Sequence, residues 1–82
     1  MNKLKYFKIA NQLQTYITVL AVLDEDFQDR LYYEIEVLYI EEYSIEHLNI
    51  TIDFLLQYCE NIENYEMCTA LLSLHNKINN LN

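Results

Sequence analysis

Four side chains of this 82-residue chain have the chemistry of soft metal ligands or of nucleophiles: His47, His75, Cys59 and Cys68. Zinc sites usually take paired ligands from a short motif such as CxxC or HExxH, so that two ligands share one face. No two of the four residues stand at such a spacing, and His75 falls in an apolar stripe where a core histidine is expected. The sequence therefore predicts no metal site and no cofactor.

The two cysteines form neither a nucleophile motif nor a disulfide framework. A catalytic cysteine needs a depressed pKa and a positioned base. Cys59 and Cys68 fall instead on predicted core stripes, where cysteine acts as a small apolar residue. Carboxylates are plentiful, but a small helical bundle has little room for a substrate cavity. We expect no enzyme; an enzymatic role would require a deep pocket that holds His75 or Cys68 beside a carboxylate.

The elements that position these residues must be helices, because the chain contains no glycine and no proline. Tight hairpin turns mostly need a positive φ, which glycine adopts at least cost, and phosphate-binding loops need glycine for close backbone approach. Short turns built from Asn, Asp and Ser can join helices without either residue. The predicted fold class is all-α, a compact small bundle of three to four antiparallel helices in a single domain over residues 1–82.

Apolar residues recur at spacings of three and four, which predicts amphipathic helices over about 2–22, 25–43, 45–62 and 65–80. Candidate N-caps stand before three of them: Asp24 or Asp26, then Ser44, then Asn64. The predicted core stripes of the first three helices are Phe7, Ala10, Leu13, Ile17 and Leu20; Phe27, Leu31, Ile35 and Leu38; and Ile45, Leu48, Ile52, Leu55, Cys59 and Ile62.

Two of these helices carry a second apolar stripe. On the helix over 25–43 it consists of Tyr33, Val37 and Ile40, and on the helix over 45–62 of Ile50, Phe54 and Tyr58. A helix that is apolar on two sides lies either in the centre of a bundle or under a binding partner. We interpret the helix over 25–43 as two-sided, with one side on its own core and the other toward a partner or a second copy of the chain.

Charge is strongly segregated along the sequence. Residues 1–23 carry a charge of +3, residues 24–66 carry −12 and residues 67–82 carry +1, for a net charge of −8 at pH 7. Phosphate binding depends on Lys and Arg, so direct binding of free nucleic acid is not expected. A basic protein surface is the better electrostatic match.

The acidic, tyrosine-rich helix over 25–43 is the predicted docking surface. Tyrosine beside carboxylates suits an arginine-rich partner, because stacking and charge attraction act together. The alternative is a solvated acidic face that keeps a small protein soluble, with boundary tyrosines. The candidate partner-binding residues are Asp26, Asp29, Tyr33, Glu34, Glu36, Val37, Ile40 and Glu41.

Targeting signals are not evident in the chain. Asn11, Gln12 and Gln14 interrupt any signal-peptide core near the amino end, and no apolar run reaches the roughly 20 residues that cross a bilayer. Abundant Ile, Asn and Tyr, which have AT-rich codons, point to a bacterial or phage gene. We expect a protein of the bacterial host cytoplasm, without membrane association.

These features favour a non-enzymatic interaction protein. In size, charge and lack of a catalytic motif the chain resembles anti-CRISPR and other anti-defence proteins of phages and mobile elements, and that resemblance of character implies an inhibitor that docks on a basic nucleic-acid-processing enzyme. Its carboxylates would stand where nucleic-acid phosphates stand. The alternative is a homo-oligomeric structural or assembly subunit, such as a homodimer, in which the second apolar stripes of the helices over 25–43 and 45–62 pair across a symmetry axis.

Overall fold

The computed structural model of the chain describes residues 3–40 and 44–80, with the side chains of residues 37–40 outside that description. Its elements are α1 (Lys3–Leu23), the short 3-10 helix η1 (Glu25–Phe27), α2 (Gln28–Ile40), α3 (Ile45–Asn61) and α4 (Tyr65–Asn79). No strand occurs in these residues, which confirms the predicted all-α bundle. The helix predicted over 25–43 begins as a 3-10 turn, and its predicted last residues, 41–43, lie outside the described residues.

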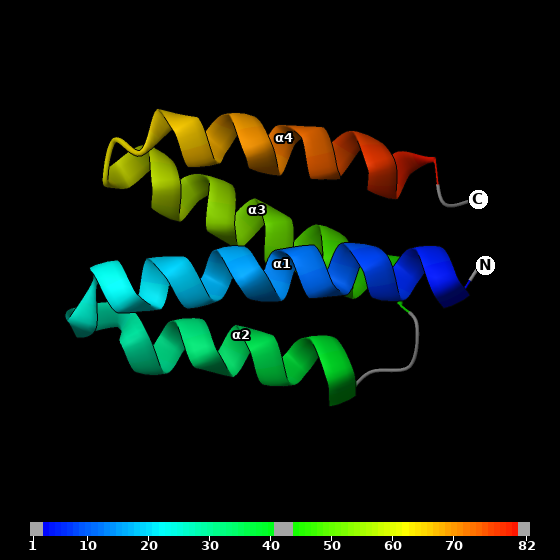
Figure 1. Cartoon of the computed structure of the whole chain (residues 1–82), viewed down its shortest axis with the longest axis horizontal. Coiled ribbons are helices and arrows are strands. Elements are labelled where there is room, and N and C mark those ends of the chain that lie inside the picture. The colour runs from blue at the N-terminus through cyan, green and yellow to red at the C-terminus, as the bar shows by residue number, and fades with distance from the viewer. Residues whose placement is uncertain (1–2, 41–43, 81–82) are drawn as a thin grey trace.

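The four helices run alternately up and down as two hairpins (Figure 1). α1 packs mainly against α2 and α3 mainly against α4, and the hairpins join through more limited contacts of α1 with α4 and of α2 with α3. Both chain termini lie at one end of the bundle, and η1 and the α3–α4 turn lie at the other end (Figure 1). No helix in the described part of the chain is both long and apolar enough to cross a membrane.

Polar side chains begin the elements as the sequence predicts. Asp24 caps η1, Ser44 caps α3 and Asn64 caps α4, each accepting a hydrogen bond of 3.2–3.3 Å from a backbone N–H two or three residues further on. These bonds satisfy donors that have no partner within the helix. Asp26, the other candidate cap, lies exposed within η1 instead.

The core is made mainly of the predicted stripes. Its buried residues are Tyr6, Ile9, Ala10, Leu13, Ile17, Leu20, Ala21, Leu31, Leu48, Ile52, Leu55, Tyr58, Cys59, Leu71, Leu74 and Ile78. Three predicted core residues, Phe7, Phe27 and Ile62, are exposed. Phe27 departs from its stripe because a 3-10 turn advances about 120° per residue and carries it out of register with α2. Ile62 follows the last residue of α3 as its cap, and Tyr6 takes the buried position beside Phe7.

The turn between α3 and α4 contains the one residue at positive φ in the described chain, Glu63 at φ 59°. The Asn64 N–H donates to the Cys59 carbonyl at 2.9 Å, and the Glu63 N–H donates to the Glu60 carbonyl at 3.1 Å. These two bonds make a Schellman ending for α3, in which glycine usually occupies the left-handed position. A glycine-free chain therefore places a glutamate where a Cβ is unfavourable.

We expect Glu63→Gly to raise the free energy of unfolding by roughly 0.5–1 kcal/mol. Glycine removes a left-handed penalty of about 1–2 kcal/mol but loses about 0.5–1 kcal/mol more backbone entropy on folding. Urea denaturation measures the change. Glu63→Ala is the matched control, because alanine removes the same charge and keeps the Cβ. A glycine variant no more stable than the alanine variant would contradict this account of the turn.

Candidate partner-binding surface

α2 has one inward and one outward face. Leu31 is fully buried, and Ile35 packs against the core four residues later. Asp29, Tyr33 and Glu36 recur at spacings of four and three on the other side and are exposed. α2 is therefore amphipathic, with an acidic, tyrosine-bearing outer face.

Glu34 does not belong to this outer face, so the prediction that its carboxylate projects toward a partner is wrong. The residue is only 5% exposed and lies three residues after Leu31 on the inward side. Its Oε1 forms an ion pair with Arg30 Nη2 at a distance of 3.1 Å. The i, i+4 pairing with Arg30 compensates the charge of the buried Glu34 carboxylate.

Arg30 is also held by aromatic rings from two helices. Its guanidinium carbon lies 4.8 Å from the ring centre of Phe54 on α3 and 6.0 Å from that of Tyr33 on α2. An arginine over an aromatic face gains from the ring quadrupole. This arginine therefore joins the outer face of α2 to the second apolar stripe of α3.

A hollow of about 400 Å³ opens beside Arg30 between the start of α2 and the end of α3. Phe27, Phe54 and Tyr58 line it, together with Asn61 and Ile62. The Phe27 and Tyr58 rings meet edge to face at 5.7 Å, and Phe54 stacks on Tyr58 at 6.4 Å. Phe27 remains 51% exposed at its rim. The hollow is thus an aromatic pocket open to solvent.

Tyr58 is fixed in this pocket by Asp24. The Tyr58 hydroxyl donates a hydrogen bond to the Asp24 carboxylate, which links α3 to the connection after α1. Burial raises the pKa of Tyr58 above its usual range, and the hydrogen bond and negative charge of Asp24 raise it further. The hydroxyl therefore stays protonated and keeps donating at neutral pH.

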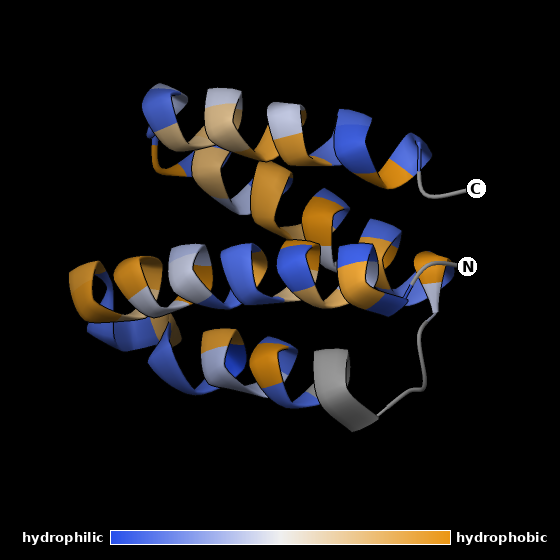
Figure 2. Cartoon of the chain, turned by 45° about the vertical axis from the view of Figure 1, so that its right-hand side comes forward, coloured by the Kyte–Doolittle hydropathy of each residue, from blue (hydrophilic) through white to orange (hydrophobic). Residues whose placement is uncertain are grey.

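The end of the bundle that carries η1 is acidic and partly apolar; we call it the acidic end. The start of α2, the end of α3 and the start of α4 meet there (Figure 1). They bring together Asp24, Glu25, Asp26, Asp29, Glu60, Glu63 and Glu66, with Arg30 as the opposing cation. The last turn of α1, at the left of Figure 2, adds apolar surface through the exposed side chains of Val22 and Leu23. Exposed apolar area among charged groups is typical of a protein-binding surface.

The structure divides the predicted partner-binding residues into three groups. Asp26, Asp29, Tyr33 and Glu36 are exposed, and Glu34 is buried, while the side chains of Val37 and Ile40 and the whole of Glu41 lie outside the described residues. In the second stripe of α3, Ile50 is exposed and Phe54 is half-buried, but Tyr58 is buried.

The sequence prediction missed Phe27 and Arg30 as members of the surface. Phe27 was expected in the core, and Arg30 was counted only as a charge. The Arg30 and Glu34 spacing of four residues was the signal that could have found the ion pair. Nothing in the sequence showed that Phe54 would meet Arg30, because that contact joins two helices.

The two histidines and two cysteines lie in different surroundings. Within the described residues no three His, Cys, Asp or Glu side chains gather as a metal site. The two thiols interact with each other. The pKa of Cys59 is raised to about 11, mainly by burial and secondly by the neighbouring Cys68. His75 Nδ1 is buried and has no hydrogen-bond partner in the described structure, and neither of the hollows described here has a histidine or cysteine in its described lining.

No protein-family model matches the chain, and comparisons with curated proteins and with solved structures returned no significant match.

We expect Tyr58→Phe to lower the free energy of unfolding by about 1–2 kcal/mol near pH 7, because a hydrogen bond to a carboxylate is lost while the ring contacts remain. The difference should shrink above about pH 10. There the unfolded tyrosine releases its proton, whereas folded Tyr58 retains it, so the wild type loses stability as pH rises. Chemical denaturation at several pH values measures both effects. Tyr65→Phe, at an exposed tyrosine of α4, is the control; an equal loss in both variants would contradict the role of Asp24.

We expect iodoacetamide at pH 8 to modify Cys68 well before Cys59. Cys59 is buried and its pKa is about 11, so its thiolate is scarce, whereas Cys68 is half-buried. Peptide mass spectrometry over a time course follows each site separately. Addition of urea should abolish the difference, and preferential labelling of Cys59 in the folded protein would refute the expected order.

Proposed function

We propose that this protein is a small non-enzymatic binding protein that docks through its acidic end on a basic surface of a partner protein. The observation that carries the proposal is the aromatic pocket beside Arg30 among exposed carboxylates. Aromatic residues and arginine are enriched at the energetic centres of interfaces, and charged residues typically form the rim. The aromatic pocket with Arg30, at the carboxylate-rich acidic end, combines both kinds of residue.

The apolar part of the surface suits a side chain inserted from the partner. Phe27, at the rim of the pocket, offers an exposed ring edge to an aliphatic or aromatic anchor. Arg30 is already positioned by its ion pair and by Phe54, so it would lose little conformational freedom on binding. These features support a pre-formed site.

The charged part favours a partner rich in Lys and Arg. Asp26 in η1 and Asp29 in the first turn of α2 are both exposed, and the chain as a whole carries a net charge of −8. Complementary charge steers association and contributes to the choice of partner. Basic surfaces of this kind are common where proteins bind nucleic-acid phosphates.

The sharpest form of the proposal is therefore an inhibitor of a nucleic-acid-processing enzyme. By covering the basic groove of such an enzyme, the acidic end would compete with its nucleic acid. An anti-defence inhibitor, such as an anti-CRISPR protein of a phage or mobile element, is the corresponding biological role.

Self-association is the second candidate, and one observation favours it. Ile50 lies on the second apolar stripe of α3 and is 53% exposed near the middle of that helix. A pairing of this stripe across a two-fold axis would cover it. A homodimer of this kind would act as a structural or assembly subunit.

We expect the tagged protein to capture a basic nucleic-acid-binding enzyme from bacterial lysate at about 50 mM salt and to release it at about 1 M salt, because exposed charge pairs are screened. Asp26→Lys combined with Asp29→Lys should abolish capture. The measurement is mass spectrometry of the eluates, followed by the activity of the purified enzyme with each variant.

Glu46→Lys combined with Asp53→Lys is the matched control, because it makes the same change in charge at two exposed carboxylates of α3 that lie outside the acidic end. This variant should still capture the enzyme. Recovery of the bait alone would count against docking on a partner. A dimer that forms as the protein concentration rises, and that Ile50→Glu dissociates, would favour self-association instead.

A further inference from the structure

A second hollow, of about 540 Å³, lies between the first turns of α1 and the last turns of α4. Its described lining includes Lys5, Lys8 and Lys77, the amides of Gln12 and Asn80, and Ile9. No carboxylate belongs to the described lining, although the chain has thirteen Asp and Glu residues against five Lys and Arg. We call this hollow the lysine groove.

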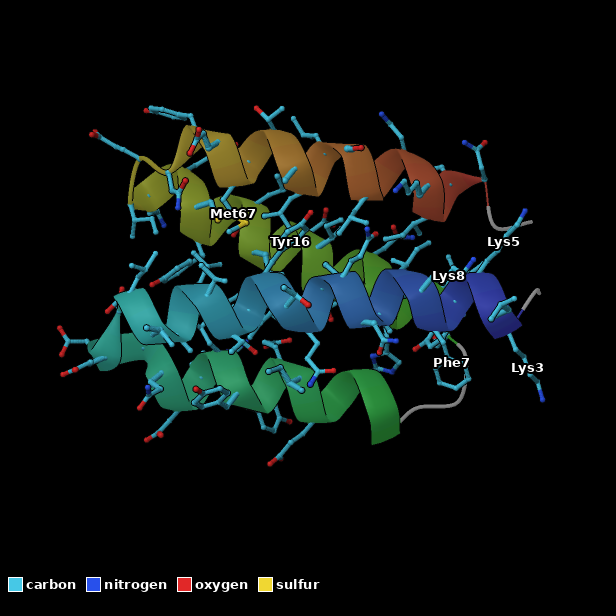
Figure 3. The ribbon with its side chains drawn as sticks, in the orientation of Figure 1. Lys3, Lys5, Phe7, Lys8, Tyr16 and Met67 are labelled. Carbon is cyan, nitrogen blue, oxygen red and sulfur yellow. The ribbon has the colours of Figure 1, made fainter. Side chains whose placement is uncertain are left out.

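Two short polar stripes form the walls of the groove. Lys5, Lys8 and Gln12 follow one another at spacings of three and four on α1, and Lys77 in the last turn of α4 stands three residues before Asn80, the C-cap of that helix. Side chains at these spacings share a helix face. Figure 3 shows Lys5 and Lys8 on the side of α1 toward the end of α4, whereas Lys3 lies on the opposite side of the helix.

The floor and rim add other means of recognition. Ile9, only 4% exposed, gives an apolar floor. The Asn80 amide nitrogen donates to the Asn76 carbonyl at 3.0 Å, which fixes the side chain. A hollow of this size accommodates a small molecule, and amides beside an apolar surface can orient its uncharged part.

The α1 lysines stand at a helix end where the helix dipole does not favour positive charge. The amino-terminal end of a helix favours negative charge, yet the first turn of α1 contains no acidic residue and its first two turns carry Lys3, Lys5 and Lys8. Lys77, by contrast, is a favourable cation in the last turn of α4.

We propose that the lysine groove binds a small polyphosphate anion, either inorganic or part of a nucleotide. Three lysines match the multiple charges of linked phosphates, whereas a single carboxylate would leave most of that charge uncompensated. A long nucleic acid fits less well, because its backbone would extend beyond the groove toward a protein surface with a net charge of −8. The groove lies at the end opposite the proposed docking surface, so each proposal can fail alone.

The test is a titration of the 15N-labelled full chain at about 50 mM salt, low enough to limit screening. The probes are pyrophosphate, adenosine triphosphate and a short mixed-sequence DNA duplex, each without divalent cations. Saturable shifts of the amides of residues 5–12 and 77–80 are expected with at least one of the two phosphate compounds. Tighter binding of the triphosphate would indicate a nucleotide, and equal binding would indicate the phosphates alone.

Lys8→Gln and Lys77→Gln should each weaken binding about fivefold to tenfold, which corresponds to roughly 1–1.4 kcal/mol. Lys3→Gln is the matched control, because it removes the same charge from the same helix on the side away from the groove. It should weaken binding less than twofold. Circular dichroism of all three variants verifies that the fold is retained.

Three results would overturn the proposal. One is a dissociation constant weaker than about 10 mM for both phosphate compounds. Another is an equal loss of affinity in Lys3→Gln and Lys8→Gln, which would show attraction by overall charge. The third is tighter binding of the DNA duplex than of either phosphate compound, which would assign the lysines to a nucleic-acid backbone.

Discussion

Burial of the apolar face of α1 is the constraint on which the rest of the structure depends. Leu13, Ile17 and Leu20 are fully buried, and α1 contacts each of the other three helices. Because α1 packs most closely on α2 and α3 on α4, the two hairpins meet along narrower seams. The aromatic pocket lies on the seam of α2 with α3, and the lysine groove lies on the seam of α1 with α4.

Because the helices alternate in direction, the charge segregation along the sequence gives the bundle one lysine-bearing end and one acidic end. The lysines at the start of α1 meet Lys77 at the end of α4, although more than sixty residues separate them in sequence. The acidic residues around η1 meet the end of α3 at the opposite end (Figure 1). Such a polar molecule can steer a basic partner toward one end and attract a small anion toward the other.

At the acidic end, polar contacts position the aromatic side chains. Asp24 fixes the Tyr58 hydroxyl, Glu34 fixes Arg30, and Arg30 in turn lies over Phe54. The cysteines lie in or against the core, and the raised pKa of Cys59 disfavours its thiolate. These contacts support the proposal that the acidic end recognises a partner by shape and charge.

The helical fold and the start of each capped element follow from the amino-acid sequence alone. Three local features carry this information: the absence of glycine and proline, the periodic apolar residues, and the caps Asp24, Ser44 and Asn64. Each has its effect within about one helical turn, so it can be interpreted without knowledge of the packing. The acidic outer face of α2, with Asp29, Tyr33 and Glu36, followed from the same periodicity. The tertiary structure alone decided that Phe27 lies at the rim of a pocket, that Glu34 is buried, and that Lys8 and Lys77 share a groove. Those outcomes depend on a 3-10 turn that shifts the helix register and on contacts between helices distant in sequence, which local periodicity does not specify.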